Sequence, residues 1–292
     1  MPTVAFVTRQ GLGLPADDLH AAAELEARGV VVEPAVWDDT TVPWARYDAV
    51  VLRSCWDYHL RPAEFRGWID RMERQRVPLW NPPALVRWNI EKRYLRDLAA
   101  AGVPMVPTRW VEPGDSVSLP DLLAGEGWDE AVIKPVVSAS AHATWRTRLP
   151  VAPEDALRFS EASRHTALMV QPFLRAITDD GEWSLCFFGG RYSHAVRKSP
   201  ARGDFRVQIE HGGRTRAAIA PPSAIEQARR ALDAVPAPPL YARVDGTWVD
   251  GVLRIIELEL IEPCLFLGCD AAAPGRFADA IAAAAEAGAD AA

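Results

Sequence analysis

The sequence has 292 residues, of which 49% are hydrophobic and 24% charged, with a net charge of −7. This length can bury a proper core and predicts about two or three domains. The acidic balance argues against nucleic acid as the primary partner, since phosphate backbones favour basic surfaces. No apolar run approaches the roughly 20 residues of a membrane span, and no signal-peptide pattern is present, so we expect no membrane association.

The first third of the chain predicts alternating strands and helices. Strands are expected over residues 4–7, 30–36 and 49–52, and helices from Asp17 or Asp18 to Arg28 and over about 63–75. Buried strands that alternate with helices are typical of a parallel sheet covered on both faces. We expect a linker over residues 78–83 and then one helix over about 89–101, closed by Gly102 and Pro104.

The rest of the chain mixes short strands with helices. Strands are expected over 106–111, 131–137, 144–148 and 167–173, and helices over 119–125, 153–164, 223–235 and from Arg276. Two hairpins are predicted, one with strands 182–188 and 191–197 around Gly189-Gly190, the other with strands 241–249 and 252–261 around Asp250-Gly251. We therefore expect domains over residues 1–83, 84–170 and 171–292.

Cysteine and lysine usage adds two constraints. The cysteines Cys55, Cys186, Cys264 and Cys269 lie in apolar or strand-like runs without a CxxC motif. This pattern argues against a disulfide framework or zinc site and favours a reducing cytoplasm. Only three of the 32 basic residues are lysine, namely Lys92, Lys134 and Lys198. Lysine and arginine are not interchangeable where a compact ammonium meets a phosphate, so these lysines are candidate phosphate contacts, although chance is an equal explanation.

The second hairpin contains the clearest candidate site. Arg243 and Asp245 alternate with an apolar residue on one strand, and Glu257 and Glu259 do the same on the returning strand. Residues two apart on a strand point to one face, so three carboxylates converge beside an arginine. Carboxylate oxygens suit Mg²⁺, so Asp245, Glu257 and Glu259 are predicted metal ligands. The alternative is a solvated charged face on an ordinary hairpin.

Further candidate positions precede that hairpin. Lys134 ends a buried strand and is followed by small residues that include Ser138 and Ser140, whose backbone N–H groups could bind an anion. A structural strand-end lysine is the competing interpretation. The segment from Gln171 through Phe173 to Leu174 could offer backbone groups to a purine, and Glu182 could accept hydrogen bonds from ribose hydroxyls. Three cations follow for a polyphosphate: Arg197, Lys198 and Arg206.

Taken in order, these motifs resemble the ATP-grasp superfamily. The set comprises Trp88-Asn89-x-x-Lys92, Ile133-Lys134-Pro135, Gln171-Pro-Phe-Leu174, Gly181-Glu182, Arg197-Lys198, Arg206, Arg243-x-Asp245 and Glu257-x-Glu259. It is similar to the branch that contains glutathione synthetases, D-alanine–D-alanine ligases and the ligase that closes the D-cycloserine ring. The resemblance implies an ATP-grasp fold of mixed α/β and α+β class, in which a parallel α/β domain precedes two α+β subdomains that clamp ATP.

The resemblance also implies a role for each matched residue. Lys92 and Lys134 would hold the α- and β-phosphates, and Lys198 the terminal phosphates. Residues Gln171–Leu174 would bind adenine and Glu182 the ribose. Arg243, with Arg206, would stabilise the transferred phosphoryl group, and Asp245, Glu257 and Glu259 would bind Mg²⁺. Two departures are present: relatives commonly have Asn where Glu259 stands, and the phosphate loop lacks the glycines of glutathione synthetase.

The substrate end is predicted from the first domain. Arg53 follows a parallel strand at the edge where such sheets bind ligands, and could pair with a substrate carboxylate. Asp57 could bind an amine, Trp56 and Tyr58 could wall the pocket, and Arg9 could face the same crevice. An aromatic packing patch between domains explains these residues equally well. Glu262 could contact a substrate amine or lie on the surface.

The resemblance implies a cytoplasmic ATP- and Mg²⁺-dependent carbon–nitrogen ligase in antibiotic biosynthesis. It would phosphorylate the carboxylate of a small amino-acid-like substrate to an acylphosphate, which a nitrogen nucleophile attacks. The pattern of the first domain is most similar to the cyclo-ligase group, which implies ring closure of O-ureido-D-serine. The alternatives are an intermolecular amino-acid or dipeptide ligase and a nucleotide-binding regulatory protein without turnover. The oligomeric state is not predicted.

Overall fold

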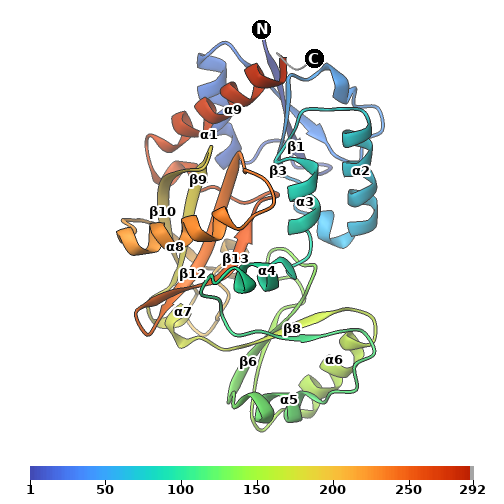
Figure 1. Cartoon of the computed structure of the whole chain (residues 1–292), viewed down its shortest axis with the longest axis vertical. Helices are drawn as coiled ribbons and strands as arrows, with labels where there is room; N and C mark the ends of the chain where they lie inside the picture. Colours follow the sequence, from blue (N-terminus) through green and yellow to red (C-terminus); the bar gives the residue numbers. More distant parts are fainter. Residues whose placement is uncertain (290–292) are drawn as a thin grey trace.

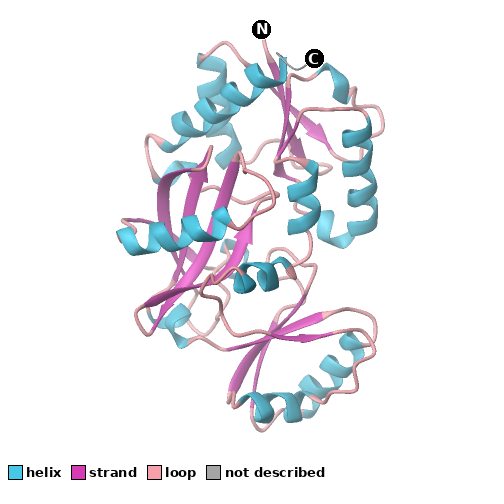
Figure 2. Cartoon of the chain, in the orientation of Figure 1, coloured by secondary structure: helices cyan, strands magenta, loops and turns pink. Residues whose placement is uncertain are grey.

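The computed structural model describes residues 1–289, which form three β-sheets with helices packed around them (Figures 1 and 2). The first sheet is parallel, in the order β2-β1-β3-β4. Its strands are β1 (Thr3–Thr8), β2 (Val31–Val36), β3 (Ala49–Ser54) and β4 (Leu79–Trp80). The expectation of a parallel sheet in the first third of the chain is thus confirmed.

Strand β1 shows why this sheet is buried on both faces. Val4 and Phe6 pack with helices α1 (Ala16–Ala27) and α9 (Ala273–Ala289), whereas Ala5 and Val7 pack with α2 (Pro62–Arg74). Side chains alternate between the faces of a strand, so an uninterrupted apolar run serves two helical layers at once.

The C-terminal helix α9 returns to the first sheet and packs beside α1 (Figure 1). It begins at Ala273, three residues before the predicted Arg276. Its Phe277 is fully buried, with its ring centroid 4.9 Å from that of Phe188 and 5.8 Å from that of Tyr241. The helix therefore packs against both the first sheet and the two predicted hairpins, which contain Phe188 and Tyr241.

The second sheet is antiparallel, in the order β5-β8-β6-β7. Its strands are β5 (Arg109–Val111), β6 (Glu130–Pro135), β7 (Trp145–Arg148) and β8 (Leu168–Pro172). Helices α5 (Leu119–Glu126) and α6 (Pro153–Ser163) cover it, as the lower part of Figure 1 shows. The expected domain boundary at residue 171 falls inside β8, so the division into domains stays a prediction.

The third sheet is antiparallel and carries both predicted hairpins. Its order is β11-β10-β9-β12-β13, with β9 (Glu182–Phe188), β10 (Arg191–Ser199), β11 (Arg214–Ala218), β12 (Tyr241–Val249) and β13 (Val252–Glu259), and α8 (Pro222–Asp233) packs on it. Gly189-Gly190 and Asp250-Gly251 all have positive φ, as a two-residue type I′ turn requires. The edge strand β11 was not predicted, because its sequence, RTRAA, has no apolar alternation.

Two predicted segments differ from the structure. The expected helix over 89–101 is shorter, α4 (Tyr94–Ala100), and a separate helix that was not predicted, α3 (Pro83–Asn89), precedes it. The chain breaks between them because the backbone N–H of Lys92 donates to Val136 O at 2.9 Å instead of continuing a helix. The expected linker over 78–83 contains β4, which pairs with β3. A short helix, α7 (Arg175–Asp179), was also not predicted.

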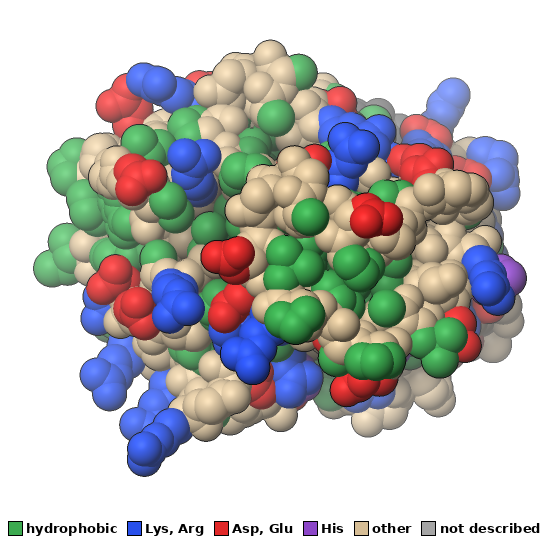
Figure 3. All heavy atoms as spheres, turned by 90° about the horizontal axis from the view of Figure 1, so that it is seen from below, with side chains coloured by type: hydrophobic (Ala, Val, Ile, Leu, Met, Phe, Trp, Pro, Cys, Tyr) green, Lys and Arg blue, Asp and Glu red, His purple; other side chains and the backbone are tan. Residues whose placement is uncertain are grey.

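Acidic and basic side chains are mixed over the face seen from below in Figure 3. Across residues 1–289, no helix combines the length and apolar character needed to cross a membrane. The four cysteines are free thiols, and Cys55 and Cys186 are buried.

Candidate active site

A cavity of about 460 Å³ collects residues from all three parts of the fold. Its walls include the ends of β6 and β8, the loop over residues 138–144, the inner face of the third sheet, and Trp56 and Tyr58 after β3. All three lysines of the chain, Lys92, Lys134 and Lys198, line it. The lysines are therefore gathered at one site and are not scattered by chance.

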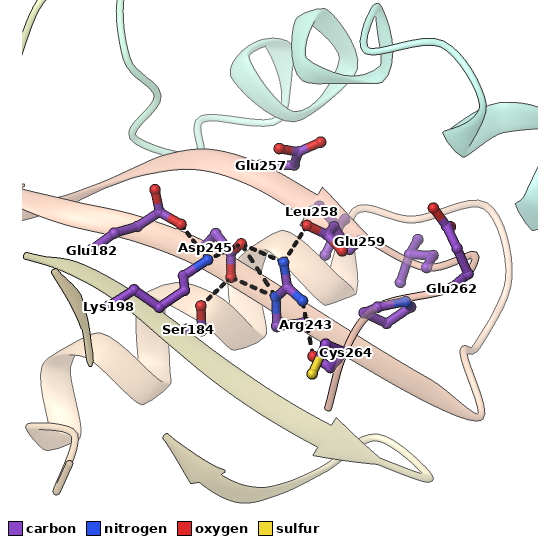
Figure 4. A network of polar contacts seen from close by, with 12 residues as sticks. Glu182, Ser184, Lys198, Arg243, Asp245, Glu257, Leu258, Glu259, Glu262 and Cys264 are labelled. Atoms are coloured by element: carbon purple, nitrogen blue, oxygen red, sulfur yellow. Dashed lines mark hydrogen bonds and ion pairs between the residues drawn. The ribbon is translucent and has the colours of Figure 1, made fainter. Parts of the chain in front are cut away.

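The hairpin of β12 and β13 brings the predicted charged residues together, with the help of a β-bulge between Asp245 and Gly246 that shifts the register by one residue. Arg243 pairs with Glu259 and Asp245 with Glu257, so the four charged side chains share one face of the sheet. Arg243 donates to Asp245 at 2.9 Å and also contacts Glu259 (Figure 4). Burial alone would raise the pKa of Asp245, but Arg243 and Lys198 outweigh it and hold that pKa well below its usual range.

The same network extends to β9 and β10. Ser184 Oγ donates to Asp245 Oδ1 at 2.6 Å, and Lys198 Nζ lies 3.0 Å from Asp245 Oδ2 and 2.5 Å from Glu182 Oε1. Burial would lower the pKa of Lys198, yet Asp245 and Glu182 raise it overall, so this ammonium stays charged. Ser184 was missed from the sequence, although it lies two residues after Glu182 on the same face of β9 and opposite Asp245.

Glu257 and Glu259 differ in how far nearby cations balance their negative charge. Lys92 Nζ lies 2.9 Å from Glu257 Oε1 and also donates to Ser138 O at 2.5 Å. Burial tends to raise the pKa of Glu257, but Lys92 and Lys134 lower it overall. For Glu259, burial dominates over Arg243, and with Asp245 adding repulsion its pKa is raised to about 7. Glu259 is thus a half-buried carboxyl whose negative charge is only partly balanced by nearby cations.

The three predicted metal ligands are each held by a cation of the protein. Throughout the described chain, no group of three or more His, Cys, Asp and Glu side chains is already arranged to hold a metal ion. Figure 4 shows the reason, because Asp245 and Glu259 turn to Arg243 while Glu257 points away from both. The metal-binding role of these residues therefore remains a prediction.

Lys134 is the one lysine of the cavity that lacks a partner. Its ammonium forms no hydrogen bond or ion pair with any residue between 1 and 289, whereas Lys92 and Lys198 are both paired. Burial is the main cause that lowers the pKa of Lys134, and Glu257 partly opposes it. Such an unpaired, desolvated cation is suited to bind an anion.

The loop after Lys134 has an unusual backbone. Ser140, Ala141 and Ala143 have φ values of +49°, +54° and +53°, in the left-handed region that favours glycine. Each such non-glycine residue costs roughly 1–2 kcal/mol of conformational energy. The loop thus reaches by strained backbone a shape that glycines would give freely. His142 on this loop lies against His59 of the first domain, with ring centroids 5.3 Å apart.

The predicted adenine segment also borders the cavity. Gln171, Phe173 and Leu174 line it, together with Ser138 and Ser140 of the loop. Gln171 Nε2 donates to Thr108 Oγ1 at 2.8 Å, and Phe173 N–H donates to Glu130 O at 2.9 Å. Arg206 also lines the cavity, and its guanidinium forms an ion pair with Asp204 at 2.8 Å.

Three of the six predicted substrate residues do not reach the cavity, which corrects the sequence analysis. Arg53 is only 1% exposed, because it lies 2.8 Å from Asp18 on α1 and donates to Pro263 O. Asp57 faces Trp37 and Arg61 at 3.0 and 2.8 Å. Arg9 lies in the loop after β1, bound to Gln10 O. Trp56, Tyr58 and Glu262 do line the cavity.

Residues 261–267 after β13 form a clamped segment that sequence reasoning missed. Successive backbone groups are held by side chains from several elements: Tyr241 Oη to Ile261 O at 2.7 Å, Trp56 Nε1 to Glu262 O at 3.0 Å, Arg53 Nη2 to Pro263 O at 3.2 Å, Arg243 Nη1 to Cys264 O at 2.8 Å, and Asp17 to the N–H groups of Leu265 and Leu267 at 2.8 and 2.5 Å. The segment is therefore fixed beside the metal-binding candidates. No local pattern reveals such contacts.

The fold and this cavity define an ATP-grasp ligase, that is, a carbon–nitrogen ligase that uses ATP. A sequence model described as "D-cycloserine synthetase DcsG, N-terminal domain" matches residues 4–81. The cycloserine biosynthesis protein DcsG of Streptomyces lavendulae is 34% identical, covering 97% of this chain and 98% of that protein. The chain therefore belongs to the DcsG family.

Solved structures agree with this assignment. The crystal structure of D-cycloserine synthetase DcsG has a TM-score of 0.87 at 32% identity and covers 97% of this chain and 99% of its own. The D-alanine–D-alanine ligase from Bacillus anthracis has a TM-score of 0.72 at 13% identity, with 98% of both chains covered, and so shares the fold. The predicted ATP-grasp fold is confirmed.

Proposed function

We propose that this protein closes the ring of D-cycloserine from O-ureido-D-serine at the expense of ATP. The carboxylate of the substrate takes the γ-phosphoryl group, which gives an acylphosphate and ADP. The ureido nitrogen next to oxygen then attacks the acyl carbon, loses its proton, and phosphate leaves as the ring closes. Water removes the carbamoyl group as carbon dioxide and ammonia. The observation that carries the proposal is the similarity to DcsG over nearly the whole chain.

The polyphosphate of ATP is assigned to the lysine end of the cavity. The unpaired ammonium of Lys134 would contact a phosphate directly, and Lys92 would join it from its place beside Ser138 and Glu257. Backbone N–H groups of Ser138 and Ser140 would cover the phosphates. Lys198 would contact the terminal phosphates, close to Asp245. Fixed cations of this kind stabilise phosphoryl transfer without a covalent nucleophile on the protein.

The nucleoside is assigned to the end of β8. Phe173 N–H is already engaged by Glu130, whereas Leu174 N–H donates to no protein group within residues 1–289. Leu174 is therefore the expected backbone donor to adenine, with Gln171 and Phe173 beside it. Glu182 would accept from the ribose hydroxyls with the carboxylate oxygen that Lys198 leaves available.

Phosphoryl transfer is assigned to the hairpin. Arg243 would stabilise charge on the transferred group and on the acylphosphate oxygens, since it lies between Asp245 and Glu259 and is fixed by Cys264 O. Arg206 would add a second guanidinium after leaving Asp204. Trp56 and Tyr58 would wall the amino-acid substrate. These roles rest on placement in one cavity and on the residue types.

The donor set fits Mg²⁺. Asp245, Glu257 and Glu259 offer carboxylate oxygens on one face, and the raised pKa of Glu259 reflects burial with too little positive charge nearby. When bound, the ion would neutralise negative charge on the phosphates. Chelation should therefore abolish ADP release, and added Mg²⁺ should restore it.

The first test is ADP release with ATP, Mg²⁺ and O-ureido-D-serine as the only organic substrate. We expect one D-cycloserine per ADP, and a loss of roughly a hundredfold or more in Lys134→Ala, as for loss of a charged contact. Arg230→Ala on the exposed face of α8 is the control and should keep full activity. Release that requires a second amine would indicate an intermolecular ligase instead. ATP binding without release would indicate a regulatory nucleotide-binding protein.

A further inference from the structure

The charges of the cavity are almost completely paired within the protein. Glu182 and Asp245 share Lys198, Asp245 and Glu259 share Arg243, and Glu257 takes Lys92. The pairs made by Lys198 and Arg243 lie on the hairpin face and its neighbouring strands (Figure 4), and Lys92 reaches Glu257 from the break between α3 and α4. A buried charge without a partner is costly, so any unpaired group here calls for a specific explanation.

Two charged groups of the cavity, one of each sign, have no partner among residues 1–289: one is half-buried and the other is buried. One is the ammonium of Lys134 at the ATP end. The other is the carboxyl group of Glu262, which forms no hydrogen bond or ion pair with another residue of the described chain and which no dashed line reaches in Figure 4. An unpaired cation is explained by an incoming phosphate. By the same reasoning, an unpaired carboxyl group is explained by an incoming cation.

Glu262 is placed to meet a ligand. It is 9% exposed and lines the cavity next to Trp56 and Tyr58. Its backbone is fixed, because Trp56 Nε1 donates to Glu262 O at 3.0 Å and Arg53 Nη2 donates to the next carbonyl, that of Pro263, at 3.2 Å. The backbone that carries the Glu262 side chain is thus fixed by contacts to its carbonyl oxygens, and these contacts do not involve the carboxyl group.

We propose that the Glu262 carboxylate binds the α-ammonium group of the amino-acid substrate and so selects substrates with a free amine. The inference rests on the proposed function in one respect, namely that an amino-acid carboxylate reacts in this cavity. The ammonium of such a substrate is attached one carbon from the reacting carboxylate, and Glu262 lies three residues beyond Glu259 of the phosphoryl-transfer face. Arg53, predicted from the sequence to bind substrate, becomes a positioning residue for the segment that carries Glu262.

Burial supports this assignment. In the unliganded protein, burial first and the charge of Glu259 second raise the pKa of Glu262 to about 8. A substrate ammonium at this point would supply the missing positive charge. The alternative amine-binding residue from the sequence, Asp57, is already engaged by Trp37 and Arg61 and does not line the cavity.

The test compares O-ureido-D-serine with its analogue that has hydrogen in place of the amine, 3-(ureidooxy)propanoate. We expect the wild type to prefer the amine by roughly 10- to 100-fold in kcat/KM, the range for a charged hydrogen bond. Glu262→Gln should reduce this preference to near unity, mainly through a higher KM for O-ureido-D-serine. Asp57→Asn should retain the wild-type preference. Because the ratio is measured within each variant, a general loss of activity does not imitate the result.

Two outcomes would overturn the inference. One is a Glu262→Gln variant that keeps the amine preference of the wild type. If that variant keeps the preference but has a lower kcat, Glu262 acts as a proton acceptor and not as the ammonium-binding group. The other is a wild type without any preference. If the wild type turns over neither compound, the proposed function has failed, and calorimetric titration with D-serine and 3-hydroxypropanoate in the presence of ADP then tests the subsite alone. Tighter binding of D-serine that Glu262→Gln removes would support it, and equal binding would contradict it.

Discussion

The ammonium of Lys92 lies 2.9 Å from a carboxylate oxygen of Glu257 and joins parts of the fold that are remote in sequence. Lys92 lies in the break between α3 and α4, and Glu257 lies on β13. The same ammonium also donates to Ser138 O in the loop over residues 138–144. One lysine thus connects the loop, the hairpin and the helical break around the cavity.

This relationship predicts that Lys92→Met weakens ATP binding. Loss of a charged contact should raise the KM for ATP by roughly 10- to 100-fold. Arg96→Met, four residues on in α4 and paired with Glu112 at the surface, is the matched control and should change the KM for ATP little. Steady-state ADP release at varied ATP concentration measures both. An unchanged KM in Lys92→Met would argue against a phosphate contact.

Arg53→Met should destabilise the fold. Arg53 and Asp18 form a buried ion pair with side-chain exposures of 1% and 3%, and removing one partner of such a pair costs about 3–5 kcal/mol. Urea unfolding should show this loss, and the double variant Arg53→Met with Asp18→Leu should recover part of it, because no charge is then left unpaired. A variant with native stability and a greatly raised substrate KM would instead support direct substrate binding by Arg53.

The hairpin was predictable from the sequence, whereas the role of Arg53 was not. Period-2 alternation and the Asp250-Gly251 turn are local signals, and they predict the two strands and the turn between them. The pairing of Arg243 with Glu259 also needs the β-bulge between Asp245 and Gly246, which shifts the register by one residue and has no such local signal. The sequence places Arg53 just after a parallel strand, whereas in the structure it lies within β3. Its burial depends on Asp18 of α1 and on Phe277 of α9, whose ring centroid lies 5.2 Å from the guanidinium carbon. Contacts with residues as remote in the chain as Asp18 and Phe277 leave no mark near Arg53 in the sequence.

Glycine at the left-handed positions of the loop over residues 138–144 should make the protein more stable. Ala143→Gly removes the penalty of positive φ and should raise the free energy of unfolding by up to about 1 kcal/mol. Ala139→Gly is the matched control, because Ala139 is not among the positive-φ residues, and it should lower that free energy by roughly 0.5–1 kcal/mol. Denaturant unfolding of both variants shows whether each substitution raises or lowers the free energy of unfolding. Equal destabilisation by the two would show that the loop is not strained.

Without metal or substrate, stability should fall as the pH rises from about 5 to about 8. The pKa of Glu262 is raised by burial to about 8 and that of Glu259 to about 7, both from 4.5. In this window the unfolded carboxyls ionise while the native ones keep their protons, so the unfolded state binds fewer protons and the free energy of unfolding decreases. Glu262→Gln should show a smaller decrease in urea unfolding at pH 5 and pH 8. An identical decrease would mean that Glu262 does not titrate in this window.

The most direct test of the central claim follows oxygen from substrate to phosphate. O-ureido-D-serine labelled with ¹⁸O in its carboxylate is incubated with the protein, ATP and Mg²⁺, and the released phosphate and the organic product are analysed by mass spectrometry. The account predicts D-cycloserine and one ¹⁸O atom in each phosphate, because the carboxylate oxygen leaves with the phosphoryl group of the acylphosphate. Unlabelled phosphate would contradict carboxylate activation, and with it the proposed reaction.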